Sequence, residues 1–235
     1  MNIVITIAGA SQRFADAGIV TPKWALPFNG NSVLLEVING LMRMNSQSHR
    51  IHLFCLEAQE PLLRECLTDY QHASQISVTT TKELTSGQAI SAARCIINNG
   101  LEGEPVLIAP GDMIFRNLER YQFESSGNWL ALANLSGNNW SFAHLRKDGT
   151  VIKTAEKVRI SSFASVGLYH FKSGSQFLEL INHATLTNGE YYIAPLYNRL
   201  VELGEIVNSV HLSRNDFIDV GTPEAYQQGF TSTFK

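Results

Sequence analysis

Short apolar runs typical of strands alternate with amphipathic stretches typical of helices through the first half of the chain. The strand-like runs are residues 3–7, 51–56, 76–80 and 105–109, and the helix-like stretches between them are 33–44, 59–70 and 87–99. Strands connected by helices run parallel, because the chain has to cross over the sheet before it returns to it. The alternation predicts an α/β fold of the Rossmann-like, three-layer α/β/α type, with a mostly parallel, mixed sheet between two layers of helices.

The pattern changes near Trp129. Runs at 129–134, 141–145 and 151–154 are short and strand-like, and the Asp148-Gly149 pair is a hairpin turn signal. These features predict a small antiparallel excursion after the parallel part. Helices at 175–183 and 194–203, a strand at 207–212, a loop at 216–223 and a final helix are expected to follow. Since no linker or repeat interrupts the chain, we expect residues 1–235 to form a single domain.

The composition limits the possible partners. The chain is 44% hydrophobic and 17% charged, which is enough to bury a core and is unlike a disordered protein. Its formal net charge of -3 lacks the basic excess that nucleic acids and anionic membranes select. Cys55, Cys66 and Cys95 are widely separated and match no zinc pattern, as is typical of a reducing compartment. With no leader-like or membrane-spanning apolar segment, we expect a cytoplasmic monomer or homodimer without nucleic-acid or membrane partners.

The first strand-like run is followed by the loop Ala8-Gly9-Ala10-Ser11-Gln12-Arg13. In an open α/β sheet such a loop lies at the carboxyl edge of the strands, where ligands bind. Its small residues let backbone N–H groups approach phosphate oxygens, and Arg13 supplies a planar fork of donors. The loop is neither a Walker loop nor a dinucleotide fingerprint. Alone, it is equally compatible with a tight turn that carries a surface arginine.

Further short motifs occur along the chain in a fixed order. They are Thr21-Pro22-Lys23 with Leu26-Pro27, Ser86-Gly87-Gln88-Ala89, Pro110-Gly111-Asp112, Ala155-Glu156-Lys157, Ala164-Ser165-Val166-Gly167, Gly189-Glu190-Tyr191-Tyr192-Ile193-Ala194-Pro195 and Asp219-Val220-Gly221-Thr222-Pro223-Glu224. In this order the chain resembles the sugar-phosphate nucleotidyltransferases, and in particular single-domain proteins similar to NDP-sugar pyrophosphorylases. It departs from the family in the first loop, where Ser11 replaces a usual glycine and Gln12 replaces a usual Ser or Thr.

The resemblance implies a fold of the nucleotide-diphospho-sugar transferase type and a reaction. The nucleotide-binding half would be about residues 1–125 and the acceptor-binding half about 126–235. A nucleoside triphosphate would condense with a sugar phosphate or a similar small phosphate ester, releasing pyrophosphate, with Mg²⁺ as the cofactor. Asp112 and Asp219 match the metal-holding aspartates of the family, and carboxylate oxygens are ligands that Mg²⁺ prefers. Arg13 and Lys23 are the candidate catalytic cations, because two polyanions have to be neutralised as they meet.

The remaining candidates divide between the two substrates. Those for the nucleotide are Ala8, Gly9, Ala10, Ser11, Ser86, Gly87 and Gln88; those for the acceptor are Glu156, Lys157, Gly167 and Glu190. By resemblance, Lys157 would bind the phosphate of the acceptor, and Glu156 and Glu190 would accept hydrogen bonds from its hydroxyls. Gly167 would leave room for its ring. Each has a structural alternative: the aspartates as turn residues, Glu156 and Lys157 as an exposed charged pair, and Gly167 as a bulge glycine.

Two other functions compete with nucleotidyl transfer. A glycosyltransferase of the same fold usually carries an Asp-x-Asp pair, whereas Gly111-Asp112-Met113 supplies one carboxylate. A non-catalytic sensor of nucleotide or sugar phosphate has no need of both metal aspartates. The sequence leaves the base open, with pyrimidines slightly favoured by resemblance, and leaves open whether the acceptor is a sugar, a polyol or an amine. The expected role is the synthesis of precursors for surface polysaccharide or capsule.

Overall fold

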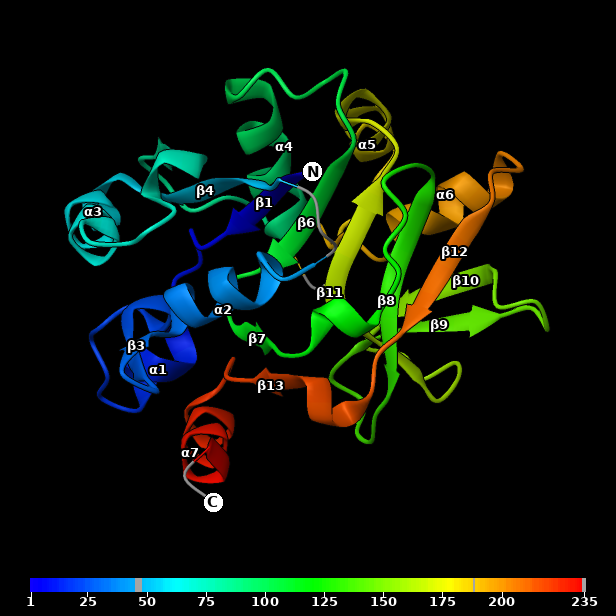
Figure 1. The fold of residues 1–235 in the computed structure, drawn as a ribbon. Coiled ribbons are helices and arrows are strands. Elements are labelled where there is room, and N and C mark those ends of the chain that lie inside the picture. The colour runs from blue at the N-terminus through cyan, green and yellow to red at the C-terminus, as the bar shows by residue number, and fades with distance from the viewer. Residues whose placement is uncertain (45–47, 188, 234–235) are drawn as a thin grey trace.

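Four parallel strands form one side of the main sheet. The computed structural model describes residues 1–44, 48–187 and 189–233 (Figure 1). The parallel strands lie in the order β6 (Val106–Pro110), β1 (Asn2–Thr6), β4 (Arg50–Leu56) and β5 (Ile76–Thr81), and β5 is the edge strand. Ile3 of β1 pairs with Ile51 on one side and Leu107 on the other. The connecting helices are α2 (Val33–Leu41), α3 (Glu60–Leu67) and α4 (Gln88–Asn98). The predicted alternation of strands and helices is confirmed.

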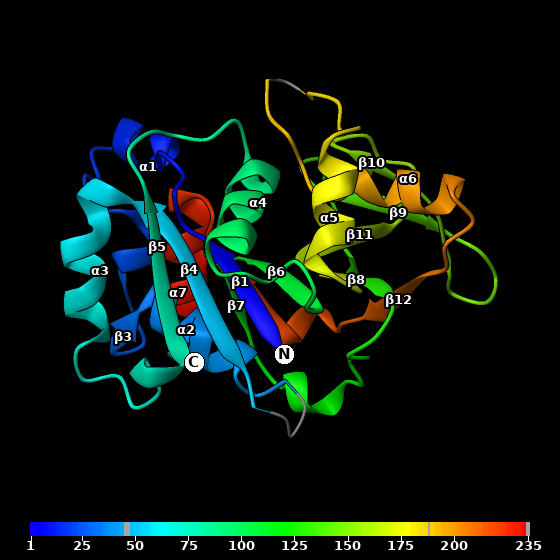
Figure 2. The same ribbon diagram turned by 90° about the horizontal axis from the view of Figure 1, so that it is seen from above.

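The later strands extend this sheet beyond β6, and most of their pairings are antiparallel. They are β8 (Asn128–Asn134), β9 (Ser141–Leu145), β10 (Val151–Glu156), β11 (Phe163–Phe171) and β12 (Val207–His211). Strand β11 runs antiparallel to β6, β8 and β9, and β12 runs parallel to β8. Figure 2 shows these strands to one side of β1, β4 and β5. The sequence analysis gave no bounds for β11, but its alternative for Gly167, a bulge glycine, agrees with the shift of register between Ser165 and Tyr169.

Successive residues of β1 pack on opposite faces of the sheet. Ile3 and Ile5 belong to the apolar cluster that includes α2 and α3, and Val4 belongs to the one that includes α4, α5 (Gly174–Ile181) and α6 (Leu196–Glu202). All three side chains are fully buried, as expected for a parallel strand that helices cover on both faces. The predicted three-layer α/β fold is confirmed. The division into two functional halves stays a prediction.

Shorter elements complete the chain. A ladder apart from the main sheet pairs β7 (Met113–Phe115) with β13 (Phe217–Asp219), and a hairpin joins β2 (Pro27–Phe28) to β3 (Asn31–Ser32). Two helices, α1 (Gln12–Asp16) and α7 (Pro223–Thr233), and 3₁₀ turns at Lys23–Ala25, Glu57–Gln59, Ala73–Gln75, Leu118–Arg120 and Arg214–Asp216 make up the rest. Within the described part of the chain, no helix has the length and apolar character needed to cross a membrane. The β7–β13 ladder matters most for the site, because β7 directly follows Asp112 and β13 ends at Asp219.

Candidate active site

Two adjoining cavities open at the carboxyl ends of the central strands. The first, of about 430 Å³, is lined by the loop that follows β1 and by the start of α4. The second, of about 730 Å³, lies over β9, β10 and β11 and reaches the end of β13. The residues that line both are Lys23, Gln88, Pro110, Asp112 and Tyr192. The structure thus brings residues from most of the predicted motifs to one place, with Lys23 and Asp112 where the two cavities meet.

The loop after β1 takes the backbone path of a glycine-containing turn. Ser11 has a φ of 51°, in the left-handed region that favours glycine, and its carbonyl accepts bonds from the N–H groups of Phe14 and Ala15 at 2.9 and 3.1 Å. Its hydroxyl accepts a long bond from the backbone N–H of Lys23 at 3.4 Å. Ala8, Gly9 and Ala10 line the first cavity, whereas Ser11 lines neither. The hydroxyl of Ser11 therefore links the loop to Lys23 in this structure.

Asp112 and Asp219 flank one point in the second cavity. A Cβ placed on Gly221 would lie 3.0 Å from Oδ2 of Asp112 and 3.1 Å from Oδ1 of Asp219. Asp112 comes from the carboxyl end of β6, as predicted, but Asp219 comes from β13, outside the main sheet. A backbone bond of 3.0 Å from Val220 N–H to the Asp112 carbonyl holds the two segments together.

Charge is concentrated around these two aspartates. The ammonium of Lys23 pairs with Oδ2 of Asp112, and the exposed Arg13 lines the second cavity rather than the first. Burial raises the pKa of the Asp219 carboxyl, and the neighbouring Asp112 carboxylate adds to the rise. Such a site favours a cation. Because the described residues contain no group of three or more His, Cys, Asp or Glu that could hold a metal, an ion here would complete its shell with water or substrate oxygens, which suits Mg²⁺.

Backbone hydrogen bonds join the segment that begins α4 to Tyr191. Tyr191 N–H donates to the Ser86 carbonyl at 2.8 Å, and Ala89 N–H donates to the Tyr191 carbonyl at 3.1 Å. Gly87 lies between them with a φ of 114°, and a Cβ there would be 2.6 Å from both N and O of Tyr191. Gly87 and Gln88 line the first cavity, whereas Ser86 lines neither. The glycine is therefore required for this close approach, and Ser86 contributes its carbonyl.

Lys157 and Glu156 face the second cavity with partners already in place. The ammonium of Lys157 donates to the hydroxyl of Tyr192 at 2.8 Å and lies 4.9 Å from the centre of its ring. That hydrogen bond raises the pKa of Lys157. Glu156 accepts a hydrogen bond from the Ser141 hydroxyl, and burial raises the pKa of its carboxyl. Lys157 is exposed and Glu156 is partly buried, so the alternative of an exposed charged pair fits the first residue and not the second.

Two more predicted acceptor residues have different placements. Gly167 lines the second cavity with a φ of 87°, and a Cβ there would lie 2.7 Å from Cγ of Pro110. The ring of Pro110 thus occupies the space that a side chain at position 167 would need. Glu190 lines the first cavity instead of the second.

Sequence reasoning missed several polar and aromatic residues that line the second cavity. They are Asn139, Trp140, Ser141, Tyr169, Tyr192 and Thr222. Tyr192 and Thr222 stand inside motifs already noticed, so their motif positions could have identified them. Asn139, Trp140 and Ser141 lie in and beside the loop before β9, where no sequence signal indicated a site. Their proximity to Glu156 arises only when β9 and β10 pair.

Comparisons with known proteins give one consistent family. The sequence profile described as Nucleotidyl transferase matches residues 3–234. A nucleoside-diphosphate-sugar pyrophosphorylase from Vibrio cholerae RC9 has a similar structure, with a TM-score of 0.82 and 27% identity over 98% of this chain and 100% of that one. No sequence among curated proteins matches the chain.

Two more distant structures share the fold. The inositol-1-phosphate CTP transferase from T. maritima has a TM-score of 0.75 and 15% identity over 98% of this chain and 94% of that one. A UDP-glucose pyrophosphorylase complexed with UDP-glucose has a TM-score of 0.77 and 14% identity over 99% and 98%. At these identities the likeness concerns the fold alone.

Proposed function

The chain belongs to the nucleotidyl transferase family, and from that premise we propose that it joins a nucleoside monophosphate to a small phosphorylated acceptor. The donor is a nucleoside triphosphate, and pyrophosphate is the second product. The nucleotide occupies the cavity of about 430 Å³ and the acceptor the cavity of about 730 Å³.

The observation that carries this proposal is the junction of the two cavities at Lys23 and Asp112. Both residues line both cavities, so a group transferred from one ligand to the other passes beside them. Phosphoryl chemistry depends mainly on positioning and on neutralising charge. A cation and a carboxylate at the meeting point of two ligand spaces suit that requirement better than they suit a sensor with a single ligand.

In the reaction, an oxygen of the acceptor phosphate attacks the α-phosphorus of the triphosphate. A new P–O bond forms on one side while the bond to the β-phosphate oxygen breaks on the other, and the electron pair leaves with pyrophosphate. The attacking oxygen is already anionic, so no side chain has to remove a proton. Lys23 neutralises charge on the phosphoryl group in transfer, and Arg13 binds phosphate oxygens from the side of the second cavity.

Asp112 and Asp219 would hold Mg²⁺ through oxygens that flank one point beside Gly221. When bound, the ion supplies further neutralisation of the triphosphate. The carboxylates keep their positions through the β7–β13 ladder and through the bond from Val220 to Asp112.

The acceptor is a sugar phosphate, in keeping with the name of the Vibrio cholerae relative. Lys157 binds its phosphate, and Glu156 accepts from its hydroxyls, because Ser141 already orients that carboxylate. Gln88, Gly87 and the Ala8–Ala10 backbone bind the nucleotide. A pyrimidine nucleotide, a cytoplasmic location and a product used for surface polysaccharide or capsule complete the proposal.

A screen for pyrophosphate release tests this function. Purified protein with Mg²⁺ is assayed with CTP, UTP, dTTP and GTP, each against a panel of sugar, polyol and amine phosphates. We expect one triphosphate and one acceptor class to release pyrophosphate together, and neither to do so alone. The Asp112→Asn protein controls for contaminating enzymes. No acceptor-dependent release from any pair, or equal release by Asp112→Asn, would overturn the proposal, and ligand binding without release would favour the sensor.

A further inference from the structure

The β7–β13 ladder fixes the spacing between the two aspartates. Asp112 immediately precedes β7, and Asp219 is the last residue of β13 and pairs with Met113. A slip of this short ladder would move one carboxylate relative to the other. Each strand of the ladder has three residues. So few backbone hydrogen bonds define a register weakly, so other contacts have to fix the position of the two strands.

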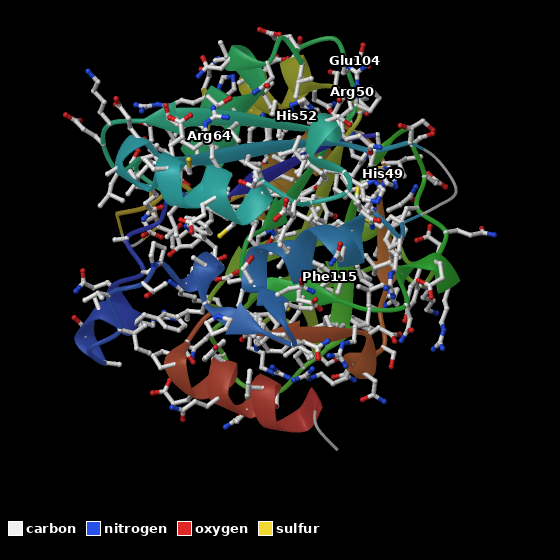
Figure 3. All side chains as sticks on the ribbon, turned by 60° about the vertical axis from the view of Figure 1, so that its left-hand side comes forward. His49, Arg50, His52, Arg64, Glu104 and Phe115 are labelled. Atoms are coloured by element: carbon white, nitrogen blue, oxygen red, sulfur yellow. The ribbon has the colours of Figure 1, made fainter. Side chains whose placement is uncertain are left out.

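Strand β7 is held from the α2 side. Gly40 of α2 approaches it so closely that an added Cβ would lie 2.3 Å from the carbonyl oxygen of Phe115. Figure 3 shows Phe115 beside α2, and Ile114 and Phe115 are almost completely buried. Packing therefore fixes one strand of the ladder.

Strand β13 is held at the end opposite to Asp219. Asp216, only 4% exposed, accepts a bond from Nδ2 of Asn117 at 2.7 Å and one from the Tyr121 hydroxyl at 2.5 Å. The Tyr121 oxygen in turn accepts from the backbone N–H of Ser213 at 2.9 Å. The Asp216 carbonyl accepts from the N–H of Arg116 at 2.7 Å. These bonds join the chain just after β7 to the chain just before β13.

Asn117 shows that this arrangement has a conformational cost. Its φ is 52°, in the left-handed region, which asparagine tolerates better than most residues. That turn aims its amide at the buried Asp216 carboxylate. A buried carboxylate is costly unless it is well hydrogen-bonded, so the side chains of Asn117 and Tyr121 strongly favour one position of β13.

We propose that Asp216, Asn117 and Tyr121 form a register clamp that positions Asp219 against Asp112 for metal binding. This inference rests on the proposed function, because it assigns the metal to those two aspartates. The clamp residues are positioning residues and touch neither substrate. Their effect reaches the site through the three pairs of the ladder, Phe217 with Phe115, Ile218 with Ile114 and Asp219 with Met113.

Two variants loosen the clamp with little other change. Tyr121→Phe removes the hydroxyl and keeps the ring. Asn117→Gly removes the amide and allows the left-handed turn without strain. Tyr70→Phe is the matched control, since the Tyr70 hydroxyl donates to Asn39 at 2.9 Å and lines neither cavity. Asp112→Asn tests the metal assignment itself.

Mn²⁺ serves as the probe, with the free ion measured by electron paramagnetic resonance in titrations of each full-length protein at high concentration. Changing groups that orient metal ligands costs on the order of 10- to 100-fold in affinity, and we expect the lower end, about tenfold, for both clamp variants. Tyr70→Phe should bind as the parent does. Thermal midpoints check that every variant is folded.

The outcomes separate the two hypotheses. Parental affinity in both clamp variants, together with lost binding in Asp112→Asn, would overturn the clamp and leave the metal assignment in place. Unchanged binding in Asp112→Asn, or no binding by the parent protein, would overturn the metal assignment and the clamp with it. An equal loss in Tyr70→Phe would show that the effect follows general destabilisation and would also overturn the clamp.

Discussion

One methyl group at Gly87 should destabilise the protein by more than its backbone conformation alone explains. Gly87 has a φ of 114° and a ψ of 171°, a region that residues with a Cβ rarely adopt. Its added Cβ would also lie 2.6 Å from both N and O of Tyr191. These are backbone atoms, so a rotating side chain cannot relieve the clash.

Two separate costs can be estimated for Gly87→Ala. Holding alanine in this region costs of order 1–3 kcal/mol, and overpacking a well-packed contact typically costs about 1–3 kcal/mol more. Gly204→Ala is a comparison without a clash, because Gly204 also has a positive φ, of 79°, but has no atom within 4 Å of an added Cβ. We expect it to lose roughly 1–2 kcal/mol, and Gly87→Ala to lose about 2–6 kcal/mol.

Urea unfolding of both variants and the parent measures these differences. If the clash is relieved by moving Tyr191, the bonds from Tyr191 to Ser86 and from Ala89 to Tyr191 are lost as well, and the cavity of about 430 Å³ beside them changes shape. The affinity for the triphosphate should then fall in Gly87→Ala and not in Gly204→Ala. Equal losses of stability in the two variants would refute the argument from close approach.

Three further predictions concern charge. Asp112→Asn should lower turnover on the order of 10²-fold or more, while its circular dichroism spectrum and thermal midpoint stay near the parent's; normal turnover would make Asp112 a turn carboxylate. Lys23→Ala should lower turnover without weakening Mn²⁺ binding, because it removes the ammonium that pairs with Asp112; weaker binding would contradict this. Burial lowers the pKa of His170 to about 4, so the unfolded chain takes up the proton first as the pH falls. The free energy of unfolding should therefore drop by about 3 kcal/mol between pH 6.5 and 4. In urea titrations at several pH values, His170→Asn should lack this part of the pH dependence.

The elements that the sequence predicted correctly carry their signal locally. β1, β4 and β6 are apolar runs with clear boundaries, β5 is a run rich in β-branched residues, and α2, α3 and α4 each have an apolar face. The elements that it missed depend on distant partners. β7 and β13 have three residues each and exist only because each pairs with the other. No periodicity can emerge from so short a segment.

The candidate site shows the same division. The small loop at 8–10, Gln88 and Asp112 follow strands or open a helix, and their placement at the sheet edge follows from the topology of the fold. The positions of Ser86 and Glu190 were harder to predict. They depend on the backbone hydrogen bond from Tyr191 to Ser86, which belongs to no recognisable local sequence pattern. Ser141 and Tyr169 line the second cavity. Their proximity depends on the pairing of β9 with β11, which the sequence did not predict.

Lys23 and Asp112 were each predicted to bind a ligand, and in the structure they form an ion pair with each other. Their side chains are 28% and 26% exposed, so water screens the pair and its net contribution to stability is small. On the proposed function, Lys23 would therefore leave Asp112 at little cost where that carboxylate holds a metal ion, and its ammonium would be available to the triphosphate. The pairing keeps a cationic side chain oriented at the junction of the two cavities before any substrate arrives, which lowers the entropic cost of placing it there.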